Sequence, residues 1–349
     1  MTEISFVIVN YNSLDFIKNL LESFKLIDAM HAGGISKFKN TKKEPQESNN
    51  LQSEEIKANY SDKGKDDFFY EIIIFDNASS DESIRYIEEK SLTQRNIKLL
   101  KSDQNEGFCR GSNLAANSAR GKYLVFLNPD TKILEGNITS LVDFLKEKEA
   151  AGEKVGITGV KTINYDNTLQ YSSRAFPSIS RQFFESFFLF KIFRKSKIFG
   201  SYFMTWWDHK NIMEADWVSG SFMFVKKEIF NSVKGFDEDY FMYSEDTDIC
   251  LRLKKEGFKN YYYPFYTIMH LDGAIASRNI LSRELGIWKS RRLYFKKNYS
   301  SFYAFIISGL YFMGILNRLL IYFIFYIFSF KKRFKEKSKL YFDVLKSYH

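Results

Sequence analysis

Cysteine and proline are scarce in this sequence, which has two cysteines and four prolines in 349 residues. Cys109 and Cys250 form no CxxC motif, so the sequence indicates neither a disulfide framework nor a zinc site. The glycine patterns GxGxxG and GxxxxGK[ST] are also missing, which excludes the dinucleotide-binding fingerprint and the P-loop. No signal peptide is recognisable, because strand-like residues begin at Ile4, and we expect the main domain to be cytosolic.

Aromatic and basic residues are abundant instead. The chain has 36 phenylalanines, 22 tyrosines and a net charge of +9. Such a charge favours binding to phosphates or to an anionic membrane surface. Nucleic-acid binding would also fit the charge, but the basic residues concentrate beside apolar stretches, so we expect no nucleic-acid partner. The length suits one large α/β domain plus an appendage.

The segment 123–131 is the most informative stretch. The apolar run 123–127 predicts a fully buried central strand, and Pro129 ends it because proline cannot continue the ladder. Asp130 then lies at the carboxyl end of the strand, where ligands bind in open α/β sheets. A carboxylate there can hold a divalent cation, which in turn can hold a diphosphate. The alternative is an ordinary aspartate in a strand-ending turn.

Strand-like and helix-like segments alternate over the first 130 residues. The apolar runs predict strands at 4–9, 70–75, 97–100 and 123–127. The segments between them predict helices at 14–27 and 82–90, and a loop followed by a helix at 107–119. This alternation predicts a mostly parallel sheet with helices on both faces.

Two parts of the chain differ in composition from this domain. Residues 28–67 are polar and lack a sustained apolar period, which predicts a flexible surface insertion; a regulatory or partner-binding segment is the alternative. We therefore predict a main domain at 1–280, with that insertion, and a C-terminal helical, membrane-associating region at 281–349.

An ordered set of short motifs resembles the family 2 glycosyltransferases, which share the GT-A fold, and most of all their bacterial rhamnosyltransferase-type members. The resemblance covers roughly residues 4–277, apart from the insertion. Each motif alone is weak, but the order is specific. The motifs are IVNYN at 8–12, IFDNAS at 74–79, NEGF at 105–108, FLNPD at 126–130, DWVSGS at 216–221, GFDE at 235–238 and FMYSEDTD at 241–248.

The resemblance implies a nucleotide-sugar site and a divalent cation, Mg²⁺ or Mn²⁺. Asp130 resembles the last position of the DxD-type metal motif, whose first position is here Asn128, and His270 resembles the C-terminal metal ligand. A structural histidine near a strand end is the alternative for His270. Asp76 resembles the base-contacting aspartate. The remaining residues that the resemblance places at the nucleotide sugar are Asn10 and Asn12, on the ribose side, and Asn77, Asn105, Gly107 and Asn113.

An inverting transfer needs a base near the acceptor hydroxyl as it attacks the anomeric carbon. Residues 242–253 predict a loop entering a helix, with Glu245, Asp246 and Asp248 in its first turn. The resemblance assigns the base to Asp246 and leaves Glu245 and Asp248 for capping or acceptor binding. Acids in a first turn also complement the helix dipole, which is the alternative explanation.

The acceptor side is predicted at Trp217, Ser219 and Gly220, since a tryptophan can stack on a sugar and a glycine permits close backbone approach. A core tryptophan is the alternative. Residues 183–203 interleave phenylalanine with lysine and arginine, which predicts a helix in the membrane interface, a lid over a lipid-linked acceptor or a plain amphipathic core helix.

Residues 302–330 are almost wholly apolar, with an interruption at Asn317-Arg318, and the basic cluster 331–335 follows. Each half is too short to span a bilayer comfortably, and an arginine at mid-bilayer is costly. We therefore predict two interfacial or re-entrant helices held on anionic lipid at the cytoplasmic face. A single tilted transmembrane helix is the alternative.

Together these features predict a metal-dependent, inverting, non-processive glycosyltransferase of cell-envelope polysaccharide synthesis, such as O-antigen or capsule. By resemblance, dTDP-rhamnose is the first candidate donor and a lipid-linked saccharide the acceptor; galactofuranose, glucose and N-acetylhexosamine are alternative sugars. A pyrophosphorylase would need a GxGxR-type loop, and a processive synthase a QxxRW motif, and the sequence has neither. A non-catalytic scaffold would be expected to lose Asp130 or Asp246.

Overall fold

The computed structural model describes residues 2–31, 70–271 and 280–347. The predicted insertion from residue 32 onward and the segment after Leu271 lie outside the described residues. The strands are β1 Ile4–Asn10, β2 Tyr70–Asn77, β3 Ile97–Ser102, β4 Tyr123–Leu127, β5 Thr131–Glu135, β6 Val155–Ile163, β7 Leu169–Gln170, β8 Ser173–Arg174, β9 Met213–Ala215, β10 Trp217–Val218, β11 Phe222–Lys226 and β12 Lys259–His270. The helices are α1 Leu14–Ser23, α2 Lys25–His31, α3 Ser83–Thr93, α4 Gly107–Asn117, α5 Thr139–Ala150, α6 Ile179–Ser186, α7 Leu189–Ile192, α8 Lys227–Ser232, α9 Glu245–Lys255, α10 Ile280–Asn298, α11 Ser301–Ser329 and α12 Lys332–Lys346.

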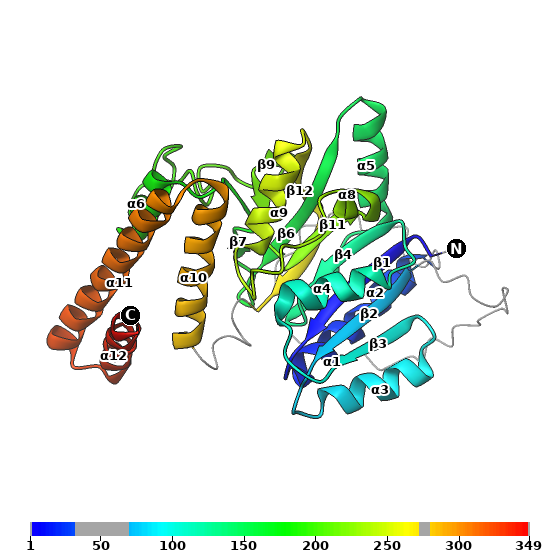
Figure 1. Ribbon diagram of the computed structural model, residues 1–349, viewed down its shortest axis with the longest axis horizontal. Coiled ribbons are helices and arrows are strands. Elements are labelled where there is room, and N and C mark those ends of the chain that lie inside the picture. Colours follow the sequence, from blue (N-terminus) through cyan, green and yellow to red (C-terminus); the bar gives the residue numbers. More distant parts are fainter. Residues whose placement is uncertain (1, 32–69, 272–279, 348–349) are drawn as a thin grey trace, which may run out of the picture.

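One mixed sheet forms the centre of the molecule (Figure 1), with the strand order β3-β2-β1-β4-β11-β6-β12-β5. The first four strands are parallel, and Asn10 of β1 pairs with Asp76 of β2, so their carboxyl ends are level. Strand β11 runs antiparallel between β4 and β6, and β6 and β12 are again parallel. The predicted α/β sheet is confirmed, and the antiparallel strands β11, β5, β7 and β9 make it mixed.

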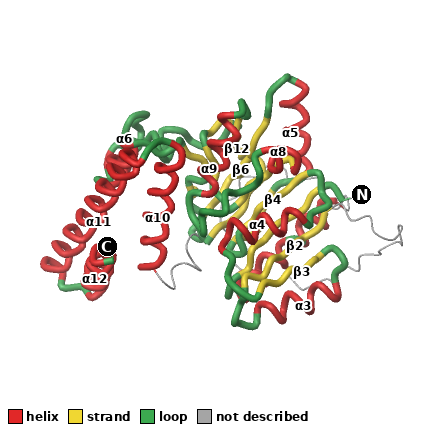
Figure 2. Tube along the Cα trace, in the orientation of Figure 1, coloured by secondary structure: helices red, strands yellow, loops and turns green. Residues whose placement is uncertain are grey.

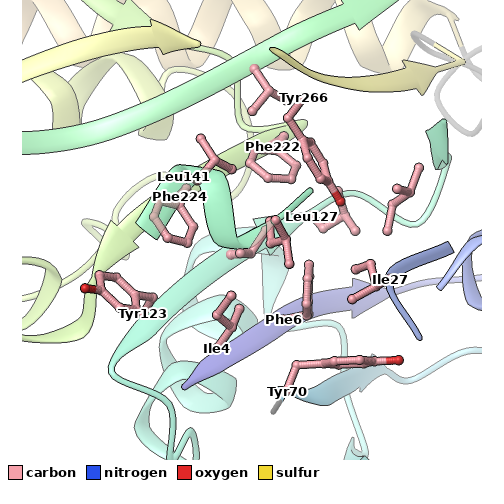
Figure 3. Packing of buried hydrophobic residues seen from close by; sticks show 14 of the residues in the cluster. Ile4, Phe6, Ile27, Tyr70, Tyr123, Leu127, Leu141, Phe222, Phe224 and Tyr266 are labelled. Atoms are coloured by element: carbon pink, nitrogen blue, oxygen red, sulfur yellow. The ribbon is translucent and has the colours of Figure 1, made fainter. Parts of the chain in front are cut away.

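Apolar side chains cover both faces of the sheet because alternate residues of each strand point to opposite sides. On one face, Phe6 packs edge-on against Phe24 with ring centres 4.8 Å apart. On the same face Tyr123 stacks on Phe224, with ring centres 5.3 Å apart (Figure 3). Helices α1, α2, α3 and α5 bury residues into this cluster. On the other face, Val7 and Phe126 share a second cluster with residues of α4, α8, α9, α10 and α11.

The helix after β1 is longer than predicted and is divided in two. It bends between α1 and α2 at Phe24, and α2 continues to His31. The expected start of the insertion at residue 28 therefore falls inside a helix, where Asp28 accepts a 2.6 Å hydrogen bond from the Tyr70 hydroxyl.

The three C-terminal helices stand to one side of the strands (Figure 2), and α11 is one continuous helix of 29 residues. The predicted break at Asn317-Arg318 is therefore wrong. The Asn317 amide donates to the carbonyl of Ser186 in α6 at 3.1 Å, and the Arg318 guanidinium lies 5.1 Å from the Phe188 ring centre. Both polar side chains have protein partners, so the helix continues without interruption. Within the described residues, α11 is the one helix that is long and apolar enough to cross a membrane.

The aromatic and basic segment 183–203 is not one amphipathic helix. It forms the end of α6, the single turn α7 and a series of turns. Phe188 adopts a left-handed φ of +58°, which ends α6 and redirects the chain into α7. Helix α6 packs closely on α11, where a Cβ at Gly314 would lie 2.8 Å from the Ser186 hydroxyl oxygen.

Candidate active site

The carboxyl ends of β1 and β2 are joined by a buried polar network. The Asn10 amide donates to a carboxylate oxygen of Asp76 at 2.7 Å and to the Ser83 hydroxyl at 2.9 Å. The second Asp76 oxygen accepts from the Ser79 backbone N–H at 3.0 Å. Both Asn10 and Asp76 are completely buried. Each Asp76 oxygen can accept one more hydrogen bond, but the turn that covers this carboxylate would have to open for a ligand to contact it.

Asn12 organises the neighbouring turn. Its side-chain oxygen accepts from the backbone N–H groups of Ser80 at 2.7 Å and Asp81 at 3.2 Å, just before α3. Its own φ is +49°, a left-handed conformation that asparagine tolerates better than most residues. Asn10 and Asn12 thus hold the β1 and β2 loops side by side at the edge where the sequence predicts the nucleotide.

The start of α4 is held by Asn77, Asn105 and Gly107. Asn77 accepts from the Glu106 N–H at 2.7 Å and donates to the Gly107 carbonyl at 3.1 Å, and Asn105 accepts from the Gly107 N–H. Gly107 has a φ of +80°, and a Cβ there would lie 2.7 Å from the Phe241 carbonyl oxygen. Only glycine fits this approach between α4 and the loop before α9.

Asn113 fixes the same loop region from α4. Its amide nitrogen donates to the Phe236 carbonyl at 2.9 Å, and its oxygen accepts from the Phe236 N–H at 3.0 Å. Asn113 therefore holds the GFDE motif through two backbone hydrogen bonds, and it takes no part in the network of Asn10 and Asp76.

Asp130 and His270 lie together, although 140 residues separate them in the sequence. His270 ends β12, and its Nε2 atom is 3.4 Å from a carboxylate oxygen of Asp130. Both side chains are buried, at 8% and 7% exposure. The other ring nitrogen, Nδ1, is 2.8 Å from the side-chain oxygen of Gln170.

This arrangement fits a divalent cation. With Nδ1–H donating to Gln170, the lone pair of Nε2 faces the Asp130 carboxylate, and the two atoms are close enough to bind one ion. No third His, Cys, Asp or Glu joins them within the described ranges. The remaining ligands would have to come from oxygen atoms of a bound substrate, as is usual for Mg²⁺.

Asp246 occupies the first turn of α9 against the backbone of Gly220. The Gly220 N–H donates to one carboxylate oxygen at 3.0 Å, and the Thr247 N–H donates to the other at 2.7 Å. Burial nevertheless raises the pKa of Asp246, because desolvation outweighs these hydrogen bonds. Tyr243 and Ser244 precede the helix with φ of +71° and +65°, a strained approach of the kind found at functional sites.

Glu245 is the second acid at this point. It is buried, and its Oε2 atom has no hydrogen-bond partner among the described residues. A Cβ at Gly220 would lie 3.6 Å from Glu245 Oε1 and 3.7 Å from Asp246 Oδ2, so both carboxyl groups border the same glycine. Burial, and then the charge of Asp246, raise the pKa of Glu245 well above its ordinary value. The pair thus consists of two adjacent buried acids whose pKa values are both raised.

Two predicted acceptor residues are used elsewhere. Asp248 is buried and accepts from Arg252 at 2.7 Å and from the Asn298 amide at 2.9 Å, so it ties α9 to α10. Trp217 is also buried: its indole N–H donates to the Ala175 carbonyl at 2.9 Å, and the Arg174 guanidinium covers its ring. Neither side chain is free for a sugar, because packing and hydrogen bonds already occupy it.

Ser219 and Gly220 link β10 to the acid pair. The Ser219 N–H donates to the Ser172 carbonyl at 2.7 Å, while its hydroxyl accepts from the Ser221 N–H. The sequence reasoning missed Gln170 and Arg174, which flank this contact on the segment 169–174. A polar residue in a short edge segment gives no motif. The contact of Gln170 with His270 and the pairing of Arg174 with Trp217 appear only in the folded structure.

The sequence is similar to a known family and to two named relatives. The sequence pattern described as Glycosyl transferase family 2 matches residues 56–215. The chain is 30% identical over 226 residues to Rhamnosyltransferase WbbL of Escherichia coli (strain K12), covering 62% of this chain and 78% of the relative. It is 24% identical over 254 residues to N-acetylglucosaminyl-diphospho-decaprenol L-rhamnosyltransferase of Mycobacterium tuberculosis (strain ATCC 25618 / H37Rv), covering 66% and 76%.

A solved structure has a similar fold. The mannosyltransferase PcManGT from Pyrobaculum calidifontis, in complex with GDP-Man and Mn²⁺, matches with a TM-score of 0.52 and 12% identity, covering 99% of this chain and 85% of that one. The predicted GT-A fold is thereby confirmed.

Proposed function

The chain belongs to glycosyl transferase family 2, and from this premise we propose that it performs an inverting, metal-dependent, non-processive transfer of one sugar. The observation that carries the proposal is the presence of two separate pairs of polar side chains, one suited to a cation and one to an acceptor hydroxyl. Asp130 and His270 form one pair, and Glu245 and Asp246, which meet at Gly220, form the other. A nucleotide-sugar transfer needs both, since one site binds the leaving diphosphate and the other activates the acceptor.

The donor nucleotide would bind at the carboxyl ends of β1 and β2. Asn10, Asn12 and Asp76 shape the turns there, and Asn77, Asn105 and Gly107 hold the start of α4 beside them. Asp130 and His270 would hold the cation, with Gln170 fixing the histidine ring. When bound, the cation supplies charge compensation for the departing diphosphate.

Asp246 would accept the proton of the attacking acceptor hydroxyl. Its raised pKa makes it a stronger base than an ordinary aspartate, and the Gly220 and Thr247 N–H groups hold its carboxylate in place. Protonated Glu245 would lie on the same side of Gly220, where it can donate a hydrogen bond to the acceptor sugar. Attack from the face opposite the nucleotide inverts the anomeric centre without a covalent enzyme intermediate.

The relatives support a choice of substrates. Both are named as rhamnosyltransferases, and the mycobacterial one is named for a diphospho-decaprenol acceptor. We therefore propose dTDP-rhamnose as the donor and a lipid-linked saccharide of the cell envelope as the acceptor.

A membrane-bound acceptor fits the geometry of α11. Ala304 and Ile307 lie in the core of the main domain, and Tyr311 and Ile315 pack with α12, so one side of the first half of α11 is committed to protein contacts. Residues 316–329 alone would extend about 21 Å, less than the roughly 30 Å of a hydrocarbon core. We propose that α11 lies in the interface of the cytoplasmic face, with its exposed phenylalanines in lipid and the basic residues 331–335 on anionic head groups.

The test is a binding and hydrolysis screen against a panel of nucleotide sugars, with and without Mn²⁺ or Mg²⁺. We expect one donor to raise the melting temperature only with metal. Asp130→Ala should abolish that shift, whereas Asp246→Asn should bind the donor and lose at least 100-fold in turnover. If no donor binds under any metal condition, the proposal is wrong.

A further inference from the structure

Arg174 is a half-buried cation held rigidly by aromatic rings. It pairs with Trp217 across the two-stranded sheet of β8 and β10. Its guanidinium carbon lies 5.0 Å from the Trp217 ring centre and 5.1 Å from that of Phe203. Its Nε atom donates to the Tyr171 carbonyl at 2.8 Å. The orientation of the guanidinium is therefore fixed in the absence of any ligand.

The other basic side chains around Arg174 are compensated. Lys254 pairs with Asp216 at 2.6 Å, and Arg291 pairs with Glu185 at 2.8 Å. Arg181 donates to the Phe176 carbonyl at 2.6 Å and lies 4.0 Å from Asp216. Across the ranges that the structure describes, no ion pair involves Arg174. The charge of Arg174 does act on the buried Asp246 carboxylate, where it counteracts the rise of the pKa, but the described residues place no carboxylate within ion-pair distance of the guanidinium. An anion from outside would therefore add the direct charge pairing that this partly desolvated cation lacks.

Arg174 also lies on the side of the acid pair. Strand β10 leads directly into Ser219 and Gly220, and the Gly220 N–H contacts Asp246. Gln170, four residues before Arg174, instead contacts His270 at the predicted metal site. The segment 170–174 therefore joins the two halves of the site, with its cation at the acid end.

We propose that Arg174 binds a phosphate group of a substrate, and that this phosphate belongs to the diphosphate that carries the acceptor saccharide. This inference rests on the proposed function. A guanidinium suits the role because its planar donors match phosphate oxygens and its charge does not titrate. The donor diphosphate has a separate place at Asp130 and His270, whereas an acceptor diphosphate at Arg174 would hold its sugar beside Asp246.

Isothermal titration of the full-length protein with farnesyl diphosphate, in a buffer that contains a chelator, tests the proposal. The chelator removes metal-dependent binding at the Asp130 end. We expect Arg174→Gln to weaken binding by about 10- to 100-fold, the usual effect of losing a charged hydrogen bond. Arg174→Lys, which keeps the charge but not the planar fork, should lose less. Arg85→Gln removes the same charge on helix α3 and should bind farnesyl diphosphate like the wild type. Farnesol, which lacks the diphosphate, should bind equally to the wild type and to every variant.

Two results would overturn the assignment. One is unchanged affinity in a folded Arg174→Gln protein. The other is binding that needs Mg²⁺ and disappears in Asp130→Ala, which would place the phosphate at the donor end. The donor screen decides the proposed function separately: if no nucleotide sugar is hydrolysed but Arg174→Gln still weakens diphosphate binding, the transferase proposal fails and the phosphate site remains.

Discussion

At the residue scale, the three acids at the start of α9 differ strongly although they lie within four positions. Asp248 is fixed by Arg252 and by Asn298, which is 50 residues away in the sequence. Asp246 accepts hydrogen bonds from two backbone N–H groups. The Glu245 Oε2 atom has no hydrogen-bond partner among the described residues. The environment of each acid, which depends on distant residues, separates the structural carboxylate of Asp248 from the pair to which we assign the acceptor chemistry.

Glu245→Gln should change how stability depends on pH. The pKa of Glu245 is raised in the folded protein by burial and by Asp246, so its contribution to stability is present below the unfolded pKa and is lost as pH rises through the folded pKa. Glutamine resembles the protonated form at every pH. We expect the variant to match the wild type near pH 5 and to exceed it by about 1–3 kcal/mol near pH 8.5.

Chemical denaturation of both proteins at the two pH values measures this difference. A gap that stays constant with pH, or that grows as the pH falls, would contradict the prediction and place the ionised form of Glu245 in the folded protein at neutral pH.

The sequence predicts which acids belong to the site but not the different role of each. Motif order placed Asp130, His270, Asp246 and Gly220 among the site residues, and the structure brings them into two pairs. Spacing could not show that Trp217 is covered by Arg174, because the contact depends on the pairing of β8 with β10.

At the scale of elements, α4 and α9 are joined through one glycine. Gly107 begins α4 at a φ of +80° and touches the Phe241 carbonyl, and the Phe108 N–H donates to the same oxygen at 2.8 Å. The loop that leads into the acid pair is therefore supported by the helix that borders the predicted nucleotide site.

Gly107→Ala should disturb both helices. The new Cβ meets both an unfavourable φ and the Phe241 carbonyl at 2.7 Å, so we expect a loss of about 1–3 kcal/mol and lower turnover. Gly152 also has a φ of +80° but has nothing within 4 Å of the added Cβ, which makes Gly152→Ala the matched control.

Thermal unfolding and donor hydrolysis of both variants distinguish the effect of the unfavourable φ, which both positions share, from that of the contact with the Phe241 carbonyl, which only Gly107 makes. The prediction fails if the two alanine variants lose equal stability and equal turnover, since the Phe241 contact would then contribute nothing.

Sequence patterns located the N-terminal elements well, because their apolar runs alternate with clear turn residues. Strand β4 was predicted with its observed ends. The C-terminal elements were harder, because Asn317 and Arg318 resemble a helix break unless their partners Ser186 and Phe188 are known. A polar residue in an apolar run interrupts a helix only when no other element satisfies it.

At the scale of the whole molecule, exposed apolar side chains lie along α11, from Phe302 and Phe305 in its first half to the second half, where they are most numerous. Phe323 is 48% exposed and Phe328 83%, and the basic residues 331–335 follow directly. Apolar insertion and attraction to anionic lipid would then act on adjoining parts of one surface.

Phe323→Ser with Phe328→Ser should weaken binding to phosphatidylglycerol-containing vesicles by at least about 100-fold, because each phenylalanine contributes roughly 1.5–3 kcal/mol on burial. The loss should persist at high salt. Lys331→Gln with Lys332→Gln should weaken binding at low salt only, since salt screens the attraction.

Vesicle sedimentation at two salt concentrations measures these effects. Leu92→Ser provides the control, because Leu92 is 86% exposed on α3, outside the proposed membrane surface. Equal sedimentation of the double phenylalanine variant and the control would show that this face of α11 does not enter lipid.

The sharing of Tyr294, Phe295, Ala304 and Ile307 between the C-terminal helices and the main core has a consequence for expression and cellular quality control. The helices that we propose to contact the membrane also contribute to the core, so a chain ending near residue 280 would lack part of that core. Burial of these side chains contributes several kcal/mol, comparable to the net stability of a typical domain. A cell that cleaved the C-terminal helices would therefore release an unstable fragment for degradation rather than a soluble enzyme.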